Sequence, residues 1–110
     1  MLDGQMQVAF EEFMRTIKES DIYKEYCYQL GKIKKNPELF EKVNEYRHRN
    51  FEIQNSCQGD ELFEKMDAFE KEYEGFREDP MVDDFLSAEL AFCRLIQEIN
   101  IYLMEGLDFE

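Results

Sequence analysis

The sequence predicts an all-α protein that contains a long antiparallel helical hairpin, a C-terminal helix and one or two N-terminal helices. Its 110 residues include only two prolines and five glycines, so few positions interrupt a helix. Apolar residues recur three and four positions apart through most of the chain. The hydrophobic share of 44% excludes a disordered chain. We therefore expect one helical domain over residues 1–110, with 107–110 as an acidic tail that frays or docks through Phe109.

The segment from Asp79 to Leu107 predicts the helix around which the chain is organised. Pro80 suits a first helical position, Asp79 can cap it, and Gly106 can end it. Its apolar residues fill well over half of the helix circumference, which is more than one neighbour needs. We therefore expect contacts with the rest of the chain on one side and with a second copy on another, completing a bundle by self-association. The predicted self-association interface consists of Val82, Phe85, Leu86, Phe92, Ile96, Ile99 and Leu103.

Two stretches with alternating four- and three-residue spacing predict the hairpin. The first seam consists of Leu39, Val43, Tyr46, Asn50, Ile53 and Cys57. The second consists of Leu62, Met66, Phe69, Tyr73 and Phe76. Between them lies a polar turn at residues 58–60, where Asp60 can cap the second arm and place negative charge at its positive end. Matching seams joined by a tight turn predict antiparallel arms of about 25 to 30 Å.

Before the hairpin, the spacing predicts a short amphipathic helix from Met6 to Glu19 and another from Ile22 to Lys35. Ser20 and Asp21 offer caps between them, although a helix that runs through Ser20 is the alternative. Asn36-Pro37 is a firmer boundary, because a residue before proline is pushed away from helical angles.

The composition limits which classes of partner the protein can bind and in which cellular compartment it is expected. Acidic residues outnumber basic ones 26 to 13, and a net charge of −13 repels phosphate backbones, so we expect no direct binding to nucleic acid. No signal peptide is recognisable, and no apolar run approaches the ~20 residues of a membrane span, so we expect no membrane partner. Three cysteines without C-x-x-C spacing predict a cytoplasmic, reduced protein without disulfides.

No catalytic, metal or cofactor site is predicted, and we expect the protein not to be an enzyme. His48, the only histidine, lies opposite the first seam on what the pattern predicts to be a solvated face. The glycines are isolated and follow no strand, so none forms a phosphate-binding loop. Cys57 and Cys93 occupy apolar-face positions, where cysteine commonly packs as a small hydrophobe.

Three polar residues interrupt the apolar stripes, namely Asn50, Glu89 and Asn100. A polar group in a seam costs stability and is tolerated where it pairs with a specific partner, so these residues set helix register or line a recognition surface. Arginine and aromatic residues, which dominate protein interfaces, gather around Asn50. The candidates for a partner-binding face or for register are Arg47, Asn50, Phe51, Gln54, Glu89 and Asn100.

The order and spacing of two segments resemble the YlbF/YmcA family of small bacterial helical proteins, also called control-of-competence regulators. The first runs from Pro37-Glu38-Leu39 through Val43-Asn44-Glu45-Tyr46-Arg47 to Asn50-Phe51-Glu52-Ile53-Gln54. The second runs from Phe76-Arg77 through Val82, Phe85 and Ala88-Glu89-Leu90 to Ile96-Gln97-Glu98-Ile99-Asn100. The resemblance spans the chain from about residue 10, and it implies a self-associating all-α fold with a regulatory role and no catalysis.

In Bacillus-like bacteria, members of that family form a complex with one another and with a third protein, YaaT. The complex promotes competence, biofilm formation and sporulation, and it has been tied to a phosphorelay, to messenger RNA processing by ribonuclease Y and to iron–sulfur clusters. The resemblance therefore implies family relatives and a YaaT-like protein as partners.

The function that we predict is a non-enzymatic regulatory adaptor that acts through protein–protein interaction as a homodimer or larger assembly. One alternative is a sensor in which cysteines of two chains hold an iron–sulfur cluster, because one chain supplies three thiolates and a cluster usually needs four. The other alternative is a purely structural homo-oligomer.

Overall fold

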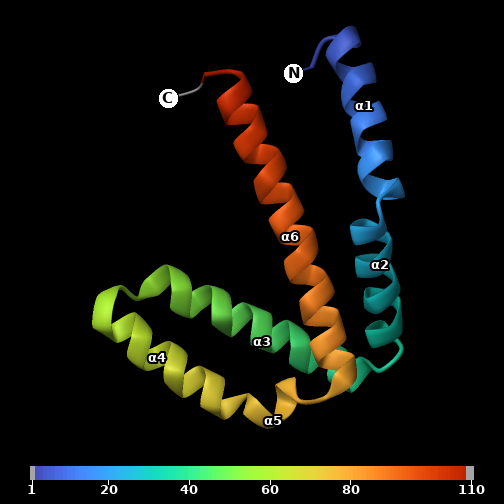
Figure 1. Ribbon diagram of the computed structural model, residues 1–110. Helices are drawn as coiled ribbons and strands as arrows, with labels where there is room; N and C mark the ends of the chain where they lie inside the picture. Colours follow the sequence, from blue (N-terminus) through green and yellow to red (C-terminus); the bar gives the residue numbers. More distant parts are fainter. Residues whose placement is uncertain (1, 109–110) are drawn as a thin grey trace. The chain divides into compact units, whose positions relative to one another are not determined.

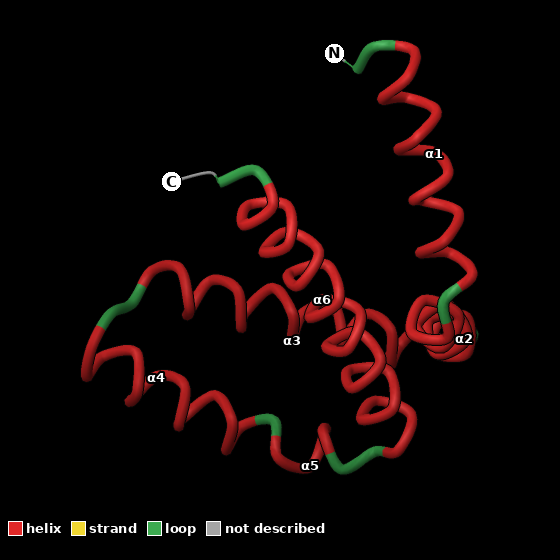
Figure 2. Tube along the Cα trace, turned by 45° about the horizontal axis from the view of Figure 1, so that its top comes forward, coloured by secondary structure: helices red, strands yellow, loops and turns green. Residues whose placement is uncertain are grey.

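The computed structural model describes residues 2–108, which form helices joined by short loops and contain no strand, so the predicted all-α class is confirmed (Figures 1 and 2). Phe109 lies outside the described residues. The helices are α1 (Gly4–Glu19), α2 (Asp21–Lys34), α3 (Pro37–Ser56), α4 (Gly59–Glu72), α5 (Glu74–Arg77) and α6 (Pro80–Gly106).

The chain divides into two compact units, which we describe separately. The terminal unit comprises Met1–Gln29 and Ser87–Glu110, and the hairpin unit comprises Leu30–Leu86. Helices α2 and α6 each contribute residues to both units.

Local signals set most helix ends where the sequence predicts them. Asn36 Oδ1 accepts a hydrogen bond from the Leu39 N–H at 3.3 Å, and Asp79 Oδ1 accepts one from the Met81 N–H at 2.9 Å. At Ser20 the backbone leaves the helical conformation, with ψ at 148°. Its Oγ accepts a hydrogen bond from the Tyr23 N–H at 3.2 Å, so α1 and α2 are separate helices.

The second arm of the hairpin departs from the prediction in two places. Helix α4 begins two residues earlier than a cap at Asp60 would place it, at Gly59, whose φ of 61° favours glycine. Asp60 therefore is not the cap, although its charge still lies in the first turn, where the helix dipole favours it. The arm also breaks at Tyr73, and Phe76 belongs to the separate short helix α5. Gly75 weakens a continuous helix here, by about 1 kcal/mol relative to alanine.

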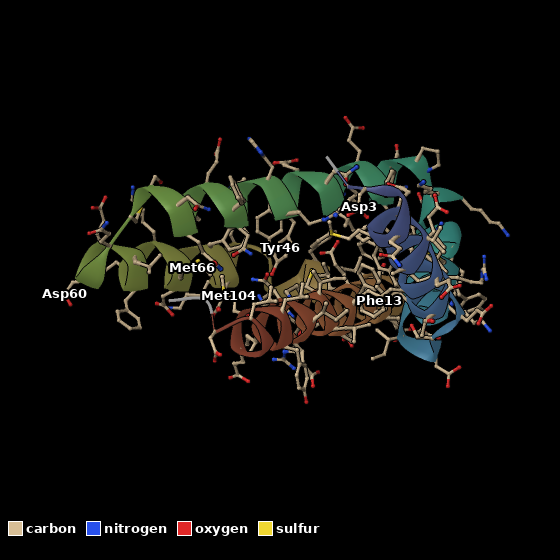
Figure 3. All side chains as sticks on the ribbon, turned by 90° about the horizontal axis from the view of Figure 1, so that it is seen from above. Asp3, Phe13, Tyr46, Asp60, Met66 and Met104 are labelled. Carbon is tan, nitrogen blue, oxygen red and sulfur yellow. The ribbon has the colours of Figure 1, made fainter. Side chains whose placement is uncertain are left out.

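Helices α3 and α4 lie side by side and form the predicted hairpin (Figures 1 and 2). Tyr46 points from α3 toward α4 (Figure 3) and stacks on Phe69, with ring centroids 5.0 Å apart. The rings of Tyr46 and Tyr73 are nearly perpendicular, with centroids 5.2 Å apart. The largest side chains that are completely or almost completely buried all belong to the hairpin unit, and these are Ile33, Val43, Phe69, Val82 and Phe85.

Candidate interaction surfaces

Helix α1 presents an apolar stripe that its own unit leaves uncovered. None of its residues is buried. The stripe consists of Met6, Phe10, Phe13 and Ile17, spaced by four, three and four residues. Phe10 and Phe13 are 49% and 43% exposed. Exposed apolar surface costs roughly 25 cal/mol per Å², so this stripe favours contact with another apolar surface.

Helix α6 carries a longer stripe with the same spacing. It consists of Val82, Phe85, Glu89, Phe92, Ile96, Ile99 and Leu103. A repeat that averages 3.5 residues is the pattern by which one helix packs along another. Ile96 and Leu103 are 43% and 55% exposed, so the end of the stripe is open. This spacing of three and four residues can be found in the sequence. It was not singled out there because apolar residues occupy more than half of the helix circumference.

The structure places the seven predicted self-association residues in different environments. Val82 and Phe85 are fully buried, so they offer no surface to a second copy. Leu86 is half-buried. Phe92 is also half-buried, because its ring packs against Tyr23 and Tyr26 of α2 at centroid distances of 5.4 and 5.2 Å.

Residues of both stripes line one hollow in the terminal unit. It has a volume of about 370 Å³ and is lined by Phe13 of α1 and by Ile99, Tyr102 and Leu103 of α6. Phe13 and Leu103 of its lining are 43% and 55% exposed, so the hollow and the ends of both stripes are accessible.

The candidates for a partner-binding face fall on both α3 and α6. Asn50 Oδ1 accepts a hydrogen bond from Gln54 Nε2 at 3.2 Å within α3, so its partner in the structure is on its own helix. Phe51 is 66% exposed. Glu89 is half-buried and Asn100 is exposed, and both belong to the terminal unit.

Arg47 has a structural role in addition to any contact with a partner. Its guanidinium lies over the Phe85 ring, 5.6 Å from the centroid. It also donates a hydrogen bond to Asn44 Oδ1 at 3.0 Å. A cation over a desolvated aromatic face contributes up to about 2 kcal/mol, so Arg47 covers the core of the hairpin unit.

Arg49 joins the two arms of the hairpin, a role that was not predicted from the sequence. It donates a hydrogen bond to the Tyr73 hydroxyl at 3.1 Å, and its guanidinium lies over the Tyr73 and Phe69 rings. The hydrogen bonds to Tyr73 and Glu72 raise the pKa of Arg49. Its position three residues after Tyr46 was the available signal, because residues at this spacing share a helix face. The adjacent His48 is exposed with Nε2 2.9 Å from Glu52 Oε1, as expected for a solvated face.

Within residues 2–108, no group of three or more histidine, cysteine or acidic side chains is arranged to hold a metal ion. Cys57 is buried, as its apolar position predicts. The same expectation for Cys93 is wrong, because Cys93 is exposed, as is Cys27. Over the same residues, no helix is both long enough and apolar enough to cross a membrane.

Comparison of the sequence with known proteins identifies its family. A family model described as "Control of competence regulator ComK, YlbF/YmcA" matches residues 8–108. The chain is also similar to a UPF0342 protein of Caldicellulosiruptor bescii, with 23% identity over 101 residues that cover 90% of this chain and 85% of the relative. No solved structure matches it. Because the family model covers nearly the whole chain, this protein belongs to the YlbF/YmcA family of control-of-competence regulators.

Proposed function

We propose that this chain is a non-enzymatic regulatory adaptor that pairs with a second copy through its terminal unit and leaves its hairpin unit for other proteins. The observation that carries the proposal is the pair of open apolar stripes on α1 and α6. The family, which is described as a regulator, supports the regulatory part of the proposal.

A second copy is the occupant that best fits these stripes. The α6 stripe has the 3.5-residue repeat of a helix that packs along another helix, and it is apolar at all four positions from Phe92 to Leu103. Two copies of one stripe can form a symmetric interface in which each covers the other. The net charge of −13 opposes pairing and is screened by salt, so moderate salt is expected to strengthen the association.

The adaptor would act in the cytoplasm, in line with its three cysteines, none of which forms a disulfide. The family resemblance supports relatives of this chain and a YaaT-like protein as further partners, in a complex that affects competence, biofilm formation, sporulation or messenger RNA processing. The hairpin unit, with its own core, would offer these partners a preformed surface.

Co-expression of an affinity-tagged and an untagged copy of the full chain tests the pairing. We expect the tagged copy to retain the untagged one in comparable amounts after extensive washing, and to retain more at moderate than at low salt. The control is the untagged copy alone on the same resin. Elution of the tagged copy without the untagged one, under all salt conditions, would contradict the proposal.

A further inference from the structure

The turn end of the hairpin unit contains an apolar hollow of about 450 Å³. Its lining comes from Gln54 of α3 and from Leu62, Phe63, Met66, Asp67 and Glu70 of α4. Asp60 marks this end of the hairpin, and Met66 lies farther along α4 (Figure 3). The hollow lies within one unit, so its geometry does not depend on the terminal unit.

The residues of α4 that line the hollow form one face with an apolar centre and an acidic edge. Three of these residues lie three, four and seven positions after Phe63, which places them on the same helix face, and they are Met66, Asp67 and Glu70. Phe63 is 77% exposed, whereas Leu62 and Met66 are half-buried and form the floor. A methionine floor adapts to the shape of an incoming side chain, and an exposed aromatic ring is a common anchor in interfaces.

The charge around the hollow selects a cationic partner. Helix α4 carries six carboxylates and two lysines. Both lysines already lie 3.1 Å from carboxylates of their own helix, Lys65 from Glu61 and Lys71 from Asp67. The lysine side chains are more than half exposed, and such surface pairs contribute about 1 kcal/mol or less, so an incoming cation can displace them. The negative field of the whole chain, at −13, adds attraction for a basic partner and repels a second copy.

The shape of the site favours a helix as the occupant. The described chain has no sheet edge to which an extended peptide could add a strand, whereas an amphipathic helix can lay apolar side chains into a groove between two helices. We propose that the turn end of the α3–α4 hairpin is a docking groove for a basic amphipathic helix of another protein. Its apolar side chain enters between Phe63 and Met66, and its lysine or arginine side chains face Asp67 and Glu70. This inference rests on the proposed adaptor function, for which it names the chemistry of the second partner.

The test uses the full chain, labelled with ¹⁵N, and a synthetic leucine–lysine amphipathic peptide of roughly 18 residues, or five helical turns. We expect its addition to shift the backbone amide signals of residues 54–70. A leucine–glutamate peptide with the same apolar face should leave these signals unchanged. Phe63→Ala and Glu70→Gln should each weaken binding of the lysine peptide by about tenfold. The matched charge control is Glu41→Gln, an exposed acid on α3 that is expected to retain full affinity.

Shifts spread evenly over all acidic segments, or equal losses in Glu41→Gln and Glu70→Gln, would show diffuse charge attraction and overturn the groove. Absence of any shift in residues 54–70 would overturn it as well. The same samples report self-association through their rotational correlation time. A chain that pairs but does not bind the peptide refutes only the groove, whereas one that binds the peptide at the groove but stays monomeric refutes only the proposed pairing.

Discussion

Phe69→Ala is expected to lower the free energy of unfolding by about 4 kcal/mol, within the range of about 3 to 5 kcal/mol for a buried phenylalanine. Phe69 is 2% exposed. Its ring lies 5.0 Å from the ring of Tyr46 and 4.9 Å from that of Tyr73. The Arg49 guanidinium covers it at 5.4 Å. The substitution therefore leaves a cavity and removes the aromatic contacts that join α3 to α4. Because a domain is stable by only about 5 to 15 kcal/mol, we expect a large fall in the urea midpoint.

Phe63→Ala is the matched control, because it makes the same change six residues earlier on the same helix. Phe63 is 77% exposed, so its loss should change the free energy of unfolding by no more than about 0.5 kcal/mol. Similar urea midpoints for Phe69→Ala and Phe63→Ala would show that the hairpin core is not built around Phe69.

Ile96→Asp is expected to convert the associated protein to a folded monomer. Ile96 is 43% exposed in the single chain, so an aspartate there meets water in the monomer and the helix should persist. In the proposed pair the same carboxylate enters an apolar interface, and symmetry introduces it twice. Burial of an uncompensated charge costs several kcal/mol, so we expect the dissociation constant to rise by at least about 100-fold. Sedimentation velocity would show a shift from twice the chain mass to the 13.3 kDa of one chain.

The control for this prediction is Gln97→Asp. It adds the same charge at the next position, which is exposed and lies outside the α6 stripe. Circular dichroism of both variants should show the helical content of the wild-type protein. If Ile96→Asp sediments like the wild-type protein, or if Gln97→Asp dissociates to the same extent, the α6 stripe is not the interface.

Helix ends could be predicted from the sequence because single residues determine them. Pro37 and Pro80 suit first helical positions, and Asp79 accepts the capping hydrogen bond that was predicted for it. Asn36, predicted only as a boundary, also accepts one. The start of α4, at the turn of the hairpin, could not be predicted in this way. A glycine at positive φ begins α4 and displaces the expected cap at Asp60, which no helical periodicity reveals.

The candidate interaction residues could be predicted only in part, because periodicity identifies an apolar face but not what covers it. Val82 and Ile96 belong to one stripe on one helix. Val82 is buried in the hairpin unit, whereas Ile96 is exposed in the terminal unit, since α6 contributes to both. Arg49 was missed for a related reason. Tyr73 lies 24 residues later in the chain, directly after the end of α4, and only the hairpin brings the two side chains together.

The measurement that tests the account most directly is hydrogen–deuterium exchange of the full chain at a low and a high protein concentration. The account predicts that α1 and the second half of α6 exchange quickly when dilute, because few contacts protect them, and slowly when concentrated, because a second copy covers them. The α3–α4 hairpin should exchange at the same rate in both samples, since its core is complete within one chain. Protection that rises with concentration in the hairpin alone, or exchange that is independent of concentration throughout, would contradict it.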